Sequence, residues 1–193
     1  MKYSVLILTF NEEVNIGGCI DSVADHTDEI VVLDSFSTDG TEEVCQARGV
    51  RFVQRPFDDF ASQRNYGLHE VEYKHPYVLM LDADERLGEE LAQEIQALPD
   101  DSDEVGIYRF RRKDYFEGRW LKRSSGYPTW FGRLVKPGAV RVEREVHEQY
   151  LTDLQTANLH GHVIHDSFNK GVSEWYRKQV RFSTMEARLL VRG

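Results

Sequence analysis

The sequence predicts an α/β fold in which a central, mostly parallel sheet is flanked by helices. Short apolar runs alternate with helical patterns over residues 3–98, and a polar cluster follows several of the runs. The runs are too short to be amphipathic helices or to span a bilayer, so they indicate buried strands. Strands that alternate with helices are typical of βαβ units, which have right-handed crossovers and parallel strands.

The elements of this first part follow in a regular order. Ile16, Ile20 and Val23 would lie on one side of the first helix, and Asp39 or Thr41 would cap the second. We expect strands over residues 3–8, 29–33, 50–53 and 77–81, and helices over 12–24, 41–47, 60–68 and 88–98.

The pattern changes after the acidic loop 99–104. Residues 105–116 and 131–142 look like strands, and the loop between them is rich in glycine and aromatic residues. Residues 173–191 have the spacing of an amphipathic helix, with Trp175 and Leu190 among its apolar residues. We expect a single domain over 1–193, with a donor half (1–104) and an acceptor half (105–193), taken from a longer protein.

Charge is unevenly divided between these halves. Residues 1–104 contain 7 Lys and Arg against 24 Asp and Glu, a net charge of −17, whereas residues 105–193 contain 17 against 9, a net charge of +8. The acidic half argues against nucleic acid as a partner. The basic half could meet phosphates or an anionic membrane face, or the two halves could neutralise each other across a contact.

The cysteines and the N-terminus bear on location. Cys19 and Cys45 lack the spacing of a metal site, which fits two buried thiols in a reducing compartment. The start MKYSVLIL has a brief apolar stretch and no small-residue cleavage site, unlike a signal peptide. We therefore expect a cytoplasmic protein, with peripheral contact at the inner face of the cytoplasmic membrane.

Polar clusters follow three of the expected strands, at residues 9–13, 34–41 and 82–85. The carboxyl ends of parallel strands share one edge, where α/β folds bind ligands. Asp82 and Asp84 are two residues apart, so on an extended chain they face the same way and could hold a divalent cation. The alternative is a strand end followed by a helix cap.

These clusters carry a resemblance. Thr9-Phe10-Asn11-Glu12-Glu13, the segment 34–41 and Asp82-Ala83-Asp84 resemble the motifs of family 2 glycosyltransferases with the GT-A fold, a nucleotide-diphospho-sugar transferase fold. The segments 130–134 and 146–148, together with His165, are similar to the bacterial subgroup that adds a sugar, often glucose, to the lipopolysaccharide inner core. The resemblance covers nearly the whole chain.

The resemblance implies an inverting transfer of a hexose from a nucleoside-diphosphate sugar, with a UDP-hexose favoured, to a glycan or lipid-linked acceptor. Mg²⁺ or Mn²⁺ would be the cofactor. Donor-binding residues would be Thr9, Asn11, Glu12, Asp34, Ser37, Arg64, Asp82 and Ala83. Ser37 could instead form a turn, and Arg64 could instead be a solvated helix charge.

The resemblance also implies the metal ligands and the base. Asp84 would bind the metal directly, and Asp82 would bind it or act on the ribose or through water. His165 would complete the set, with His160 and His162 as competitors. Glu148 would take the proton of the acceptor hydroxyl. His147 replaces the first acid of the family's usual pair and could be the base itself. Otherwise Glu148 would form a surface ion pair with Arg144.

The acceptor side rests on aromatic and basic residues. Tyr127 and Trp130 could form a stacking floor for a sugar ring, and Arg112, within the basic stretch 109–123, could bind a phosphorylated core. The alternatives are packed aromatic residues and a solvated charged loop. A non-catalytic nucleotide-sugar-binding module also stays open. A nucleotidyltransferase would need a glycine-rich phosphate loop, and a haloacid-dehalogenase-like phosphatase would need a nucleophilic Asp after the first strand, where Thr9 and Asn11 stand.

Overall fold

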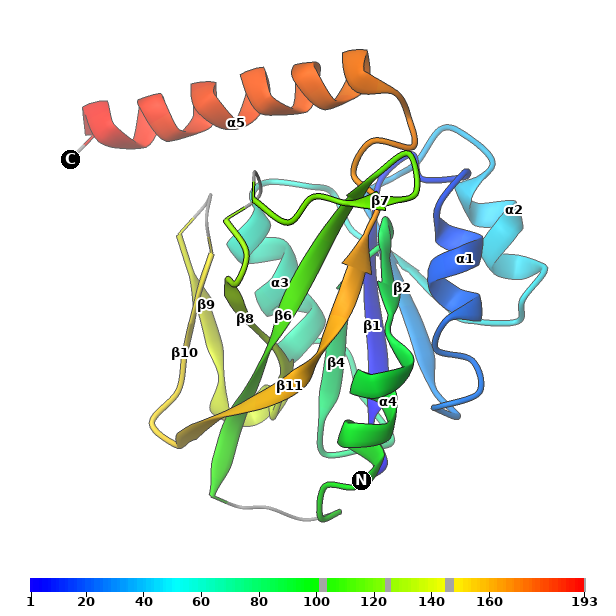
Figure 1. Ribbon diagram of the computed structural model, residues 1–193, viewed down its shortest axis with the longest axis vertical. Helices are drawn as coiled ribbons and strands as arrows, with labels where there is room; N and C mark the ends of the chain where they lie inside the picture. Colours follow the sequence, from blue (N-terminus) through cyan, green and yellow to red (C-terminus); the bar gives the residue numbers. More distant parts are fainter. Residues whose placement is uncertain (101–103, 124–125, 145–147, 193) are drawn as a thin grey trace.

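The computed structural model describes residues 1–100, 104–123, 126–144 and 148–192 (Figure 1). The strands are β1 (Ser4–Thr9), β2 (Ile30–Asp34), β3 (Arg51–Gln54), β4 (Val78–Asp82), β5 (Glu85–Leu87), β6 (Val105–Phe116), β7 (Arg119–Trp120), β8 (Trp130–Val135), β9 (Arg141–Glu143), β10 (Gln149–Leu151) and β11 (Gln155–His165). The helices are α1 (Ile16–Asp21), α2 (Thr41–Gln46), α3 (Phe60–His69), α4 (Glu89–Gln96) and α5 (Val172–Arg192), with a 3₁₀ turn at Pro137–Ala139.

The main sheet has the strand order β3-β2-β1-β4-β8-β6-β11-β5. Its first four strands are mutually parallel, and β6 and β11 are also parallel to each other. The strand β8 is antiparallel to both β4 and β6, so β6 again runs in the direction of β4. The carboxyl ends of β1, β2, β4, β6 and β11 consequently lie at one edge of the sheet, as expected for this α/β class.

The sheet is covered on both faces because its central strands are apolar on both sides. On β1, Val5 and Ile7 join the core beneath α1, α2 and α4, while Leu6 joins the core beneath α3. All three side chains are fully buried. A buried strand held between two helix layers fixes the position of the polar residues at its end.

The boundaries that we expected for the first helix (12–24) and for the strand 131–142 were wrong. The first helix covers only Ile16–Asp21, because Asn11 to Asn15 form a turn in which Asn15 donates its N–H to the Glu12 carbonyl. The expected strand 131–142 is two strands, since Pro137 starts the 3₁₀ turn and has no N–H for a ladder. The sequence reasoning missed β5 and most of β11.

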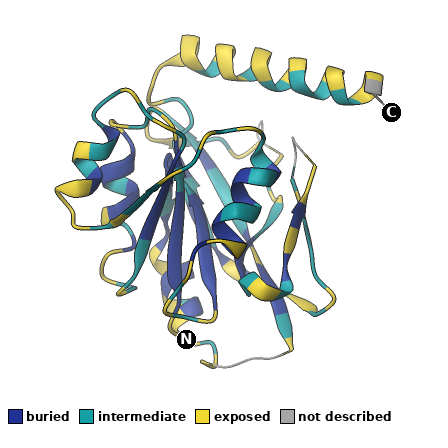
Figure 2. Cartoon of the chain, turned by 180° about the vertical axis from the view of Figure 1, so that it is seen from behind, coloured by how far each residue is buried: buried dark blue, intermediate teal, exposed yellow. Residues whose placement is uncertain are grey.

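The last helix, α5, crosses above the carboxyl edge of the sheet (Figure 1). Its outer side is exposed, and only the side toward the domain is half-buried (Figure 2). None of the helices in the described part of the chain is both long enough and apolar enough to cross a membrane.

Gly161 provides a test of this packing. It lies on β11 against α4, where an added Cβ would come within 2.5 Å of the Leu91 Cα. The backbone of Leu91 would have to move to make room for this methyl group. Gly161→Ala is therefore expected to lower the free energy of unfolding by about 1–3 kcal/mol, as measured by urea titration. The control Gly138→Ala has no described atom within 4 Å of its Cβ and should change stability little. Equal effects of the two variants would contradict the close contact of β11 and α4.

Candidate active site

The three predicted polar clusters lie together at the carboxyl edge of the sheet. In the parallel register, Thr9 of β1 is opposite Asp34 of β2, and Leu8 is opposite Asp82 of β4. The amide of Ala83 donates to the Leu8 carbonyl at 3.2 Å, which ties the acidic turn after β4 to the end of β1. The expectation that these strand ends share one edge is confirmed.

Asp82 is the centre of a charge network that joins three elements. Arg64 of α3 donates from Nη2 to one Asp82 oxygen at 2.9 Å, and Arg133 of β8 donates from Nη2 to the other at 3.2 Å. Arg64 and Arg133 are 2% and 7% exposed. Burial raises the pKa of Asp82, but the two guanidinium groups more than offset it and hold that pKa well below its usual range.

Glu148 belongs to the same network. Its Oε1 accepts a hydrogen bond from Arg64 Nε at 2.9 Å. The alternatives of a solvated Arg64 and of a surface pair between Glu148 and Arg144 are therefore wrong, and Arg144 instead pairs with Glu186 at 3.4 Å. Burial raises the pKa of Glu148, yet Arg64 and Arg133 leave it below its usual value, so the side chain is a carboxylate. His147 lies outside the described residues.

A second group forms around Asp84. His165, at the end of β11, places Nε2 3.3 Å from Asp84 Oδ2 and Nδ1 2.5 Å from Asp114 Oδ1. Burial lowers the pKa of His165, but Asp84 and Asp114 outweigh it and raise that pKa to about 9. The competitors His160 and His162 lie instead beside Glu94 and Glu90 of α4.

The pair Asp84 and His165 has the donor atoms for a divalent cation. Asp114 holds one ring nitrogen of His165, an arrangement that orients the other toward a metal. Over the described stretches of chain, no group of three or more His, Cys, Asp and Glu side chains is arranged as a complete metal site. Mg²⁺ commonly takes only one or two protein carboxylates and fills its other positions with phosphate oxygens and water. The residues present thus fit a metal that binds together with a diphosphate.

The turn after β1 is held by contacts with the turn after β2 and with the segment before α5. Asn11 has a left-handed φ of 53°, which asparagine tolerates, and its Oδ1 accepts from the amide of Thr38 at 2.7 Å. Glu12 accepts from Lys170 Nζ at 2.5 Å. The Thr9 hydroxyl is buried and has no hydrogen-bond partner among the described residues. These side chains leave polar groups directed at the edge of the sheet.

Asp34 and Ser37 contact each other directly. The amide and the hydroxyl of Ser37 donate to the two Asp34 oxygens at 2.8 and 2.5 Å, and Gln54 Nε2 donates to Oδ2 at 3.2 Å. The Asp34 side chain is fully buried. A direct bond from Asp34 to a nucleobase would therefore require the turn at 35–38 to open. Asp39 forms a turn as well, accepting from the Thr41 amide at 3.1 Å.

The aromatic residues of the predicted acceptor side lie near one another. Tyr127 packs edge-on against Trp120, with ring centroids 5.1 Å apart. The Arg111 guanidinium lies over Tyr127 and Trp130, 6.0 and 5.4 Å from their centroids. Arg112 does not join them, because it pairs with Asp114 at 3.1 Å and with Glu85 at 3.8 Å. It thus belongs to the group around His165.

Sequence reasoning missed three residues of the site: Arg133, Asp114 and Glu85. Arg133 lies in the quoted segment 130–134 but had no assigned role. Glu85 is 2% exposed, and its Oε2 accepts from the Asp82 amide at 3.0 Å. Burial and the Asp82 charge raise its pKa. For Arg133 and Glu85 the sequence offered a weak signal, a charged residue within or beside an apolar strand, but it did not name the partner of either residue. Asp114 follows a basic run and offered no such signal.

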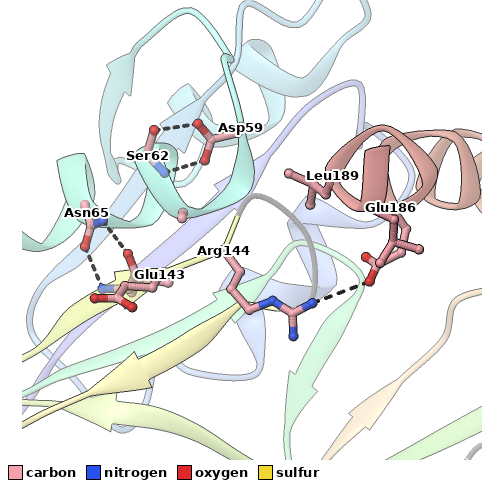
Figure 3. Close-up of a pocket in the computed structure, with 10 residues that line it drawn as sticks. Asp59, Ser62, Asn65, Glu143, Arg144, Glu186 and Leu189 are labelled. Carbon is pink, nitrogen blue, oxygen red and sulfur yellow. Dashed lines mark hydrogen bonds and ion pairs between the residues drawn. The ribbon is translucent and has the colours of Figure 1, made fainter. Parts of the chain in front are cut away.

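An open cavity of about 580 Å³ adjoins this site between α3, β9 and α5 (Figure 3). Asn65, the neighbour of Arg64, holds β9 at one wall through two bonds to the Val142 backbone, at 2.7 and 2.8 Å. Arg144 and Glu186 meet across the cavity, so β9 and α5 are joined there.

Comparison with known proteins identifies relatives. The family model described as "Glycosyl transferase family 2" matches residues 4–166. The "Lipopolysaccharide core biosynthesis glycosyltransferase LpsC" of Rhizobium meliloti (strain 1021) is 31% identical over 97% of this chain and 71% of its own length.

Among solved structures, S. aureus TarS (residues 1–349) superimposes with a TM-score of 0.61 at 18% identity, covering 86% of this chain and 61% of that one. This likeness supports the predicted GT-A fold. Glucosyl-3-phosphoglycerate synthase from Mycobacterium tuberculosis, crystallised with Mn²⁺, UDP and glucosyl-3-phosphoglycerate, gives a TM-score of 0.47 at 24% identity over 58% of this chain and 44% of its own.

The buried network makes a stability prediction. Arg64→Met would leave Glu148 without its cation and Asp82 with Arg133 alone, so the free energy of unfolding should fall by about 2–3 kcal/mol. The control Arg48→Met breaks an exposed pair with Asp21 and should cost at most about 1 kcal/mol. Urea unfolding followed by tryptophan fluorescence measures both. Equal losses would contradict a buried network at Arg64.

Proposed function

The chain belongs to glycosyl transferase family 2, and from that premise we propose that it moves a hexose, with glucose and a UDP donor favoured, to a sugar of a lipopolysaccharide inner core. The relative named for lipopolysaccharide core biosynthesis supports the acceptor class. The donor class is supported by the site at the sheet edge.

The observation that carries this proposal is a cation held at the Asp84 carboxylate, just beyond the end of β4 and on the same edge of the sheet as Asp82. That cation is the ammonium of Lys178, whose nitrogen is 3.5 Å from Asp84 Oδ2. Burial lowers the pKa of Lys178, but the charges of Asp84, Asp82 and Glu12 outweigh it and raise that pKa above its usual value. An acidic strand end that attracts a positive charge is suited to a divalent ion and the diphosphate it accompanies.

We assign the metal to Asp84 and His165, with Asp82 contributing directly, through water, or at the ribose. Bound Mg²⁺ or Mn²⁺ would neutralise negative charge that develops on the departing nucleoside diphosphate. Arg64 and Arg133 fix the Asp82 carboxylate beside this position. Arg64 therefore supports the diphosphate site through Asp82.

The nucleotide would lie along the turn after β1. The unpartnered Thr9 hydroxyl is available to it, and Asn11 and Glu12 border the same space. Asp34 and Ser37 would read the base once their turn opens, and Ala83 would contact the donor through its backbone. Tyr127 and Trp130 would bind the acceptor sugar. Arg112 would bind a core phosphate only by leaving its pairs with Asp114 and Glu85. Contact of the basic residues with a membrane face stays a prediction.

Glu148 is the proposed base. The acceptor oxygen forms a bond to the anomeric carbon while the bond from that carbon to the diphosphate oxygen breaks. Glu148 takes the hydroxyl proton, and the electron pair of the broken bond stays on the diphosphate. Attack from the face opposite the leaving group inverts the anomeric centre, so an α-linked donor gives a β product. His147 keeps its predicted role as a substitute base or as a residue that orients Glu148.

Calorimetry with UDP, GDP, CMP and ADP, each with and without Mn²⁺, tests the donor site. We expect one diphosphate, UDP, to bind with the metal, and Asp84→Asn to weaken that binding because it removes a carboxylate ligand. The control Asp21→Asn changes an exposed carboxylate on α1 and should bind as the wild type does. Metal-dependent binding that persists in Asp84→Asn would refute the metal assignment.

Glu148→Gln tests the base and separates an enzyme from a binding module. The amide can still accept from Arg64 but cannot take a proton, so transfer from UDP-glucose to truncated lipopolysaccharide should fall by about 10²–10⁴-fold. UDP affinity should stay near that of the wild type. The control Glu143→Gln lies on the exposed side of β9 and should keep full activity. If Glu148→Gln transfers at the wild-type rate, Glu148 is not the base.

A further inference from the structure

Lys178 reaches the donor edge from an element that had no assigned role. It lies in the first third of α5, a helix that crosses above the carboxyl ends of the strands (Figure 1). Its nitrogen is 3.5 Å from Asp84 Oδ2, so the last helix places a cation beside the proposed metal ligand. The family comparison ends at residue 166 and does not extend to this helix.

The chain before α5 is fixed to the edge of the site. Lys170 Nζ donates to the Asn11 carbonyl at 2.6 Å and contacts Glu12. Phe168 packs on Phe116 of β6 and stacks on Trp175 of α5, with ring centroids 4.9 and 5.2 Å apart. These contacts hold the start of α5 over the ends of β1 and β6.

Further along, α5 touches the chain around α3. Phe182 meets Phe60 with centroids 5.6 Å apart, and Arg181 lies 5.4 Å from the Phe57 ring centroid. Glu186 pairs with Arg144 across the open cavity of Figure 3. In the sequence of α5, Lys178 lies between Trp175, which packs on Phe168, and Phe182, which packs on Phe60. These contacts on either side of Lys178 fix the helix and so direct this lysine toward Asp84.

The contact between Lys178 and Asp84 is suited to exchange. The Lys178 side chain is 47% exposed, and solvent weakens an ion pair of this kind. A metal that binds Asp84 would compete with the Lys178 ammonium for this carboxylate. The diphosphate that accompanies the metal would bring phosphate oxygens within reach of the released ammonium. Lysine is a common phosphate ligand because its three N–H donors surround a compact charge.

We propose that Lys178 is a ligand of the donor diphosphate, delivered by α5, which leaves Asp84 when the nucleotide and its metal bind. The proposal rests on the proposed function. It would make α5 a wall of the donor site and would give the departing diphosphate a positive charge in addition to that of the metal.

The test compares UDP with uridine, which has the same base and ribose but no phosphate. Calorimetry in Mn²⁺ gives the affinity for UDP, and ligand-observed NMR gives the affinity for uridine. Lys178→Gln should weaken UDP binding by about tenfold or more, because a hydrogen bond to a charged group is lost, and should leave uridine binding unchanged. Lys178→Arg should restore most of the UDP affinity, since arginine also binds phosphate.

Arg177→Gln is the matched control. Arg177 is the neighbouring cation on α5 and is exposed, and within the described residues it pairs with Glu174 of the same helix, at 2.6 Å. It should bind both ligands as the wild type does. The midpoint of thermal unfolding of each variant shows whether the fold, α5 included, is retained. Because the Lys178 side chain is half-exposed, its substitution should leave this midpoint near that of the wild type.

The outcomes separate this inference from the proposed function. Unchanged or tighter UDP binding by Lys178→Gln overturns the inference, while UDP binding by the wild type still supports the donor site. Equal losses for UDP and uridine also overturn it, because they would show a general displacement of α5. If the wild type binds no nucleoside diphosphate, both the function and the inference fail.

Discussion

The structure depends on the pairing of two buried arginines with partly exposed carboxylates at one edge of the sheet. Asp82 ends an apolar strand, and Arg64 and Arg133, whose own charges are buried, hold its two oxygens. A lone buried charge is costly, whereas a hydrogen-bonded pair recovers most of that cost. The network therefore fixes α3, β4 and β8 relative to one another, and Arg64 extends it to Glu148. The proposed base and the Asp82 carboxylate are held by one set of ion pairs.

The fold delivers these groups from distant parts of the sequence. The mutually parallel strands bring Thr9, Asp34 and Asp82 to the edge, and the antiparallel β8 inserts Arg133 beside β4. The parallel pair β6 and β11 then adds Asp114 and His165, which face each other in the register. Residues 1–104 and 105–193 thus both supply strands to one sheet, and ion pairs such as Arg133 with Asp82 and Lys170 with Glu12 join the two parts near its carboxyl edge.

Much of this was predictable from short-range patterns. The apolar runs of β1, β2 and β4 identify strands, and the alternation with helices places Thr9, Asp34 and Asp82 on one edge. Long-range pairing was not predictable, because the polar run around Arg64 looks solvated until Asp82 and Glu148 are known to face it. Arg133 and Asp114 were missed for the same reason: their partners lie on strands whose order in the sheet no local pattern reveals. Lys178 was missed because its helix contacts the site only through the tertiary fold.

The central claim is that the carboxyl edge between β4 and β11 holds a divalent cation at Asp84. Anomalous diffraction from crystals grown with MnCl₂ and UDP tests it most directly, because manganese is located by its own scattering. The account predicts a manganese peak bonded to the Asp84 carboxylate, with His165 Nε2 turned to the metal and diphosphate oxygens on its other side. A peak away from Asp84, or ordered UDP at this edge without manganese, would contradict the account.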